Sequence, residues 1–176
     1  MKRYIIYFML YSIIGWCYEV FLEVFIYHWG FSNRGFLFGP YCPIYGFGAL
    51  TFILLLRKLK SKKINISKLN ITPALVFLGI MGISTAIELI ASYALEAITG
   101  GWLWDYNSYN FNFQGRIALN PSVRFGIGGM IFMYILQPLF EKMCSKLGDK
   151  KINIISIILL AIISIDFAFK IISMIR

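Results

Sequence analysis

Six charged side chains interrupt long apolar stretches of this sequence, and five of the six are acids: Glu19, Glu23, Glu88, Glu96, Asp166 and Lys170. A charge at mid-bilayer costs about 2.5–3.5 kcal/mol, so such a residue is a functional candidate by default. Glu19 and Glu23 lie one helical turn apart and share a face. Asp166 and Lys170 have the same spacing, which predicts a self-neutralising pair. Buried carboxylates can bind cationic groups, accept protons or tie helices together.

Two arginines in short polar segments supply the opposite charge. Arg34 follows Asn33 and precedes Gly35, and Arg116 follows Gly115. A guanidinium group binds a carboxylate or a phosphate at two points. Two interpretations therefore remain open. The charges form a structural network that fixes the packing of the helices, or they line a cavity that faces the outer side of a membrane.

The composition requires a membrane. Of 176 residues, 59% are hydrophobic and 14% are charged, against about 45–50% and about 25% in a soluble domain. A helix that crosses the hydrocarbon core needs roughly 20 apolar residues. The sequence predicts an all-α integral membrane bundle, a single transmembrane domain over residues 1–176, with five helices at residues 4–27, 39–57, 72–98, 122–141 and 152–175.

The basic residues predict the orientation. The net charge is +9, and 12 of the 17 Lys and Arg residues lie at the N-terminus, near 57–68 or near 142–151. Short cytoplasmic loops carry such an excess, so the N-terminus and the lysine-rich loops are predicted to be cytoplasmic in a multi-pass plasma-membrane protein. The charge therefore indicates topology and not a nucleic-acid partner. At about 1.5 Å per residue, all five acids then lie in the outer half of the bilayer.

Motifs of soluble enzymes are missing from the sequence. It contains no Walker A pattern, no nucleophile elbow and no H-E-x-x-H, and about 100 residues of predicted span leave no room for a built-in ATPase domain. Three cysteines and one histidine do not form a metal-ligand cluster. We therefore predict no metal and no cofactor.

Three motif runs resemble one family. They are Tyr11-Ser12-x-x-Gly15-Trp16-x-x-Glu19, the run from Asn33-Arg34-Gly35 through Gly39-Pro40-x-x-Pro43 to Gly48, and Trp104-Asp105-Tyr106 followed by Asn112-x-x-Gly115-Arg116. Together they resemble the type IV ABC-transporter (CmpB-like) family of small multispanning bacterial membrane proteins. The resemblance implies a permease-like subunit with a separate ATPase subunit. Five helices are few for a transport path, so a homo-oligomer or a second membrane subunit is also expected.

The resemblance and the charges select the same residues. The expected substrate-binding set is Glu19, Asn33, Arg34, Glu88, Glu96, Trp104, Asp105, Asn112 and Arg116, and the expected structural set is Gly35, Gly39, Pro40, Pro43 and Gly115. In a transporter, Arg34 and Arg116 would contact an anionic substrate group. Arg124, at the start of the fourth predicted helix, falls outside the family pattern.

Two other functions remain open. In an intramembrane enzyme acting on an anionic lipid or lipid-linked substrate at the outer leaflet, Arg34 and Arg116 would hold a phosphate. Glu19 or Glu88 would then act as a general base, with Asp105 orienting the base or a water. The third hypothesis is a lipid-binding or scaffolding protein without turnover.

Overall fold

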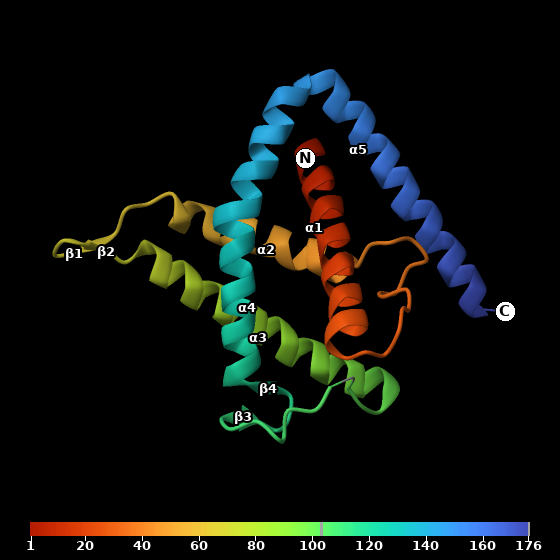
Figure 1. Ribbon diagram of the computed structural model, residues 1–176, viewed down its shortest axis with the longest axis horizontal. Helices are drawn as coiled ribbons and strands as arrows, with labels where there is room; N and C mark the ends of the chain where they lie inside the picture. The colour runs from red at the N-terminus through yellow and green to blue at the C-terminus, as the bar shows by residue number, and fades with distance from the viewer. Residues whose placement is uncertain (103, 176) are drawn as a thin grey trace. The chain divides into compact units, whose positions relative to one another are not determined.

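The computed structural model describes residues 1–102 and 104–175 and is helical over most of its length (Figure 1). The helices are α1 (Lys2–Phe21), η1 (Leu22–Ile26, a π-helical turn), α2 (Pro43–Lys60), α3 (Thr72–Thr99), α4 (Leu119–Ile131), η2 (Phe132–Leu136, also π-helical) and α5 (Gln137–Ile175). Four two-residue strands form two antiparallel hairpins, β1 (Asn65–Ile66) with β2 (Leu69–Asn70) and β3 (Asn112–Phe113) with β4 (Ile117–Ala118). The all-α fold class is confirmed.

Within the described residues, three helical segments are long and apolar enough to cross a membrane: Lys2–Ile26, Thr72–Ile98 and Leu119–Met174. The last one contains a break, because Gly148 has φ 71° and ψ 156°. Figure 1 shows the chain turning sharply within α5. The segment therefore supplies two helices. α2 is not among the three, since Arg57, Lys58 and Lys60 occupy its last turn.

The ends of two helices differ from the sequence prediction. α2 begins at Pro43, whereas the sequence suggested residue 39. Proline lacks an N–H and is favoured in the first turn of a helix, so Gly39 and Pro40 remain in the preceding loop. α4 begins at Leu119, which places Pro121 in its first turn for the same reason.

The chain forms two compact units, 1–51 with 137–176 and 52–136, of which the structure describes 137–175 and 52–102 with 104–136. In the first unit α1 packs against α5. Met9, Leu37 and Tyr41 form a buried cluster against Leu159 and Ile163. The loop 27–42 is thereby held between the two helices that will position the site.

In the second unit α3 packs against α4. Glycines allow this close approach, because a Cβ at Gly126 would meet Phe77 and one at Gly129 would meet Ile80. Small residues at a helix interface are typical of membrane bundles. Outward-facing side chains such as Ile90 remain 68% exposed, as expected for residues that contact lipid.

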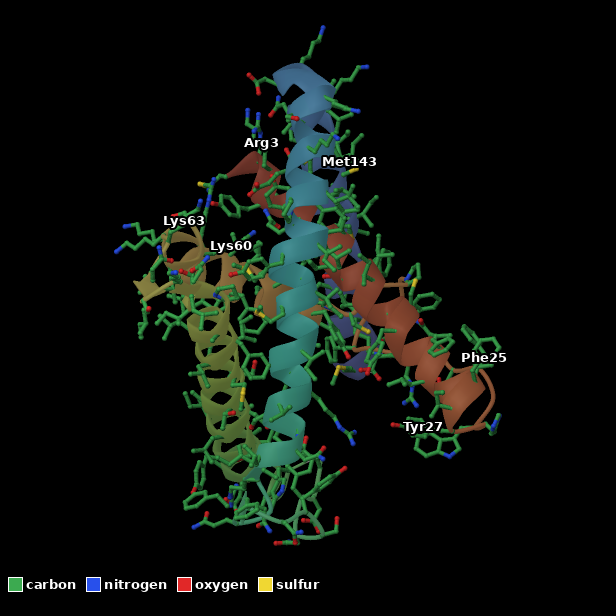
Figure 2. The ribbon with its side chains drawn as sticks, turned by 60° about the vertical axis from the view of Figure 1, so that its left-hand side comes forward. Arg3, Phe25, Tyr27, Lys60, Lys63 and Met143 are labelled. Carbon is green, nitrogen blue, oxygen red and sulfur yellow. The ribbon has the colours of Figure 1, made fainter. Side chains whose placement is uncertain are left out.

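Aromatic and basic residues mark the two ends of α1–η1. Phe25 and Tyr27 project at its C-terminal end and are at least half exposed. Arg3 lies at the other end (Figure 2). Aromatic rings are favoured at the membrane interface and basic residues on its cytoplasmic side. The arrangement agrees with a first helix that spans the bilayer.

Candidate binding site

The loop 27–42 is bound to the end of α1–η1 through Glu23. This carboxylate accepts hydrogen bonds from the Ser32 hydroxyl at 2.7 Å and the Ser32 amide at 3.2 Å. It also forms an ion pair with Arg34, with 2.9 Å between Arg34 Nη2 and Glu23 Oε1. Glu23 is 5% exposed. The charge of Arg34, whose side chain is 34% exposed, is therefore balanced by a buried carboxylate.

Asn33 fastens the same loop at a second point. Its Oδ1 accepts a hydrogen bond from Trp16 Nε1 at 2.8 Å, and its Nδ2 donates to the carbonyl oxygen of Phe38 at 2.7 Å. Gly35, two residues further on, has φ 97°. Residues other than glycine rarely adopt this backbone conformation. Asn33 and Gly35 therefore shape the loop.

Asp166 of α5 binds the other end of the loop, residues 38–41. Its carboxylate accepts hydrogen bonds from the amides of Phe38 and Gly39, at 3.1 and 2.8 Å, and from the Tyr41 hydroxyl. The pair predicted between Asp166 and Lys170 is thus replaced by three loop donors. Lys170 lies instead over the ring of Phe38, 4.8 Å from its centroid.

Replacing Asp166 by asparagine is expected to lower the free energy of unfolding by about 1 kcal/mol, because the hydrogen bonds that it accepts are exposed or only partly buried and water can replace a lost one. An amide cannot accept all three hydrogen bonds, because its NH2 group is itself a donor. The measurement is the thermal unfolding midpoint in detergent. The control is Asp149→Asn in the same helix, where the side chain is 98% exposed. Equal midpoints for the two variants would contradict this role of Asp166.

Between the loop and the helices of the first unit lies a cavity of about 510 Å³. Its polar walls come from Glu19 of α1, Arg34 of the loop, and Tyr45 of α2. The Tyr45 hydroxyl donates a hydrogen bond to Glu19, which orients the carboxylate. Arg34 Nε is buried and has no hydrogen-bond partner. The cavity therefore presents one carboxylate, Glu19, beside an arginine that is already paired with Glu23.

In the second unit Arg116 is enclosed by its neighbours. It is 6% exposed, and its guanidinium carbon lies 4.2 Å from the centroid of Tyr93 and 3.9 Å from that of Trp102. Its Nη2 forms an ion pair with Glu96 at 2.5 Å. The cation–π contacts and the ion pair together give Arg116 a structural role within the second unit.

The loop before Arg116 is held by its own polar side chains. Trp104 Nε1 donates to the carbonyl oxygen of Arg116 at 2.8 Å. Asp105 accepts from the amide of Asn107, and Asn112 accepts from the amide of Gly115. Gly115 has φ 66°. These motif residues fix the conformation of the loop.

Glu88 is reached from this loop by Tyr106, whose hydroxyl donates to Glu88 Oε1 at 2.8 Å. Burial, and then this hydrogen bond, raise the pKa of Tyr106 well above its ordinary value, so the hydroxyl keeps its proton and remains a donor. Glu88 Oε2 is buried without a partner. A second cavity, of about 770 Å³, lies beside apolar residues such as Leu78 and Phe113.

The candidate residues thus fall into two groups. Glu19, Asn33 and Arg34 lie together in the first unit, with the structural residues Gly35, Gly39, Pro40 and Pro43; Glu88, Glu96, Trp104, Asp105, Asn112 and Arg116 lie in the second, with Gly115. In the first group, Glu19 and Arg34 line a cavity. Sequence reasoning did not select Tyr45 or Tyr106 as hydroxyl donors, although each belongs to a motif run.

These features define a class, a helical integral membrane protein with paired charges at the ends of its helices. The sequence matches the family described as "Putative ABC-transporter type IV" over residues 6–171, and the chain belongs to that family. The match confirms the family expected from the motifs. No curated protein and no solved structure matches the chain.

Proposed function

We propose that this chain is the permease-like membrane subunit of an ABC-type transporter, and that the cavity beside Glu19 and Arg34 is its substrate site. The observation that carries the proposal is the cavity itself. Glu19 and Arg34, which belong to the motif runs of the sequence, line a space of about 510 Å³ that is otherwise mostly apolar. An apolar pocket with a few convergent polar groups is the usual form of a small-molecule site.

The proposed orientation follows from the basic residues. If the N-terminus and the segment 57–68 are cytoplasmic, then the loop 27–42 and its cavity face outwards. Lys60 and Lys63 lie at the basic end of α2 (Figure 2). The energy for transport would come from a separate ATPase subunit on the cytoplasmic side, because the sequence has no Walker A motif.

The proposed assembly also includes further membrane helices. Five helices are few for a gated path, so a second copy or a second membrane subunit is required. Membrane lipids surround the outward-facing apolar residues. The residues of the second unit would then hold the 104–116 loop, with Arg116 and Glu96 as its anchor.

Native mass spectrometry of the protein, purified gently from its own membrane, tests the proposal. We expect a complex that contains an ATPase subunit. A multispanning protein of another family, purified from the same membrane, is the control for chance association. A complex without an ATPase would contradict the transporter proposal. If that complex held a defined lipid lost in Arg34→Ala, it would instead support a lipid-acting enzyme or binding protein.

A further inference from the structure

The charges around the cavity do not cancel. Three acids and two bases line it or stand directly behind its walls: Glu19, Glu23, Asp166, Arg34 and Lys170. Their formal sum is −1. A substrate of the opposite sign is the one that such a site stabilises.

The unbalanced charge can be assigned to one residue. Arg34 is paired with Glu23 at 2.9 Å. Asp166 accepts three hydrogen bonds from the loop, and the charge of Lys170, one turn away, offsets its own. Within residues 1–102 and 104–175, Glu19 forms no ion pair. Its carboxylate accepts a hydrogen bond from the neutral hydroxyl of Tyr45. A carboxylate that lines an apolar cavity without a cationic partner can bind a cationic group of a ligand.

The remaining walls favour a cation for a second, independent reason. Four phenylalanines line the cavity: Phe8, Phe36, Phe47 and Phe167. The face of an aromatic ring attracts a cation, and the attraction is larger away from water. Phe36 already has Lys170 Nζ over its ring at 5.6 Å from the centroid. Rings of this kind also favour an apolar body over a small hydrated ion.

We propose that the cavity binds a hydrophobic organic cation, with its positive charge at Glu19 and its apolar groups against the phenylalanine rings. This inference rests on the proposed function, because it names the substrate class of the same site. The loop arginines alone suggested an anion, but the ion pair with Glu23 removes that preference.

Two ions of the same shape and opposite charge test the sign directly. The binding of tetraphenylphosphonium and of tetraphenylborate is measured on the full chain in nanodiscs of zwitterionic lipid, with empty nanodiscs as background. We expect saturable binding of tetraphenylphosphonium only, weakened tenfold or more by Glu19→Gln. The control, Glu141→Gln, makes the same change on an exposed acid of α5 away from the cavity and should leave the affinity unchanged.

A second variant keeps the test decisive if Glu19→Gln does not fold, which its melting curve will show. Phe36→Leu preserves the apolar wall but removes a ring, and should weaken tetraphenylphosphonium severalfold. Preferential binding of tetraphenylborate that is lost in Arg34→Met would overturn the proposal in favour of an anion. Equal binding of both ions, or of neither, would also overturn it. The presence of an ATPase subunit is measured separately, so either proposal can fail alone.

Discussion

Arg116→Ala should lower the stability of the protein by about 3 kcal/mol. The side chain is 6% exposed and lies over the rings of Tyr93 and Trp102. Its removal breaks both cation–π contacts and leaves a void between the rings. It also strips Glu96 of its partner. Since the Glu96 side chain is 43% exposed, water will recover part of that loss.

The thermal unfolding midpoint in detergent measures this effect. At roughly 2–4 °C per kcal/mol for a chain of this size, the midpoint should fall by about 6–12 °C. Arg124→Ala is the matched control, because Arg124 is an exposed arginine in the same unit. Such surface changes usually stay within about 0.5 kcal/mol. Similar midpoints for the two variants would show that Arg116 does not anchor the loop.

The helices of this protein could be predicted because hydropathy alone requires them. A run of apolar residues in a membrane must satisfy its own backbone hydrogen bonds, and a helix does so within the segment. The ends of the helices depend on single residues. Pro43 starts α2, and Gly148 breaks α5 through a positive φ. A window of hydropathy does not contain that information.

The partners of the charged residues depend on the loops, and hydropathy does not determine loop conformation. Depth selected the acids, but Glu23 meets Arg34 because the chain turns back between them, where His28 has φ 55° and Gly30 has φ 83°. Asp166 shows the limit most clearly. Its spacing from Lys170 predicted a local pair, whereas its carboxylate accepts hydrogen bonds from three donors in the loop 38–41 and the ammonium group of Lys170 lies over the ring of Phe38.

Each unit nevertheless repeats one arrangement at the C-terminal end of a long helix, α1–η1 in the first unit and α3 in the second. An acid on the helix pairs with an arginine of the following loop, and a second acid, earlier on the helix, receives a tyrosine hydroxyl. The members are Glu23, Arg34, Glu19 and Tyr45 in the first unit and Glu96, Arg116, Glu88 and Tyr106 in the second. In the second unit, aromatic rings enclose the arginine. In the first unit, Glu19 and Arg34 line a cavity, which is why we place the ligand there.

Gly46→Ala should destabilise the first unit by about 3 kcal/mol, at the upper end of the range for overpacking. A Cβ at this position would lie 2.7 Å from the carbonyl oxygen of Phe8 and 2.5 Å from Ser12 Oγ. The oxygen of Phe8 belongs to the backbone of α1 and cannot rotate away, so α1 and α2 would have to separate. Their contact also sets the distance between Glu19 on α1 and Tyr45 on α2. Gly46→Ala should therefore weaken tetraphenylphosphonium binding as well as stability.

Gly48→Ala, two residues further along the same helix, is the control for this prediction. A Cβ at Gly48 would meet no atom within 4 Å, so the change adds only helix propensity, up to about 1 kcal/mol in favour of alanine. The two variants share their chemistry and their helix, and differ in what the new methyl group meets. The unfolding midpoint should therefore fall for Gly46→Ala and stay level or rise for Gly48→Ala. A Gly46→Ala midpoint equal to that of the unmodified protein would mean that α1 and α2 do not pack this closely.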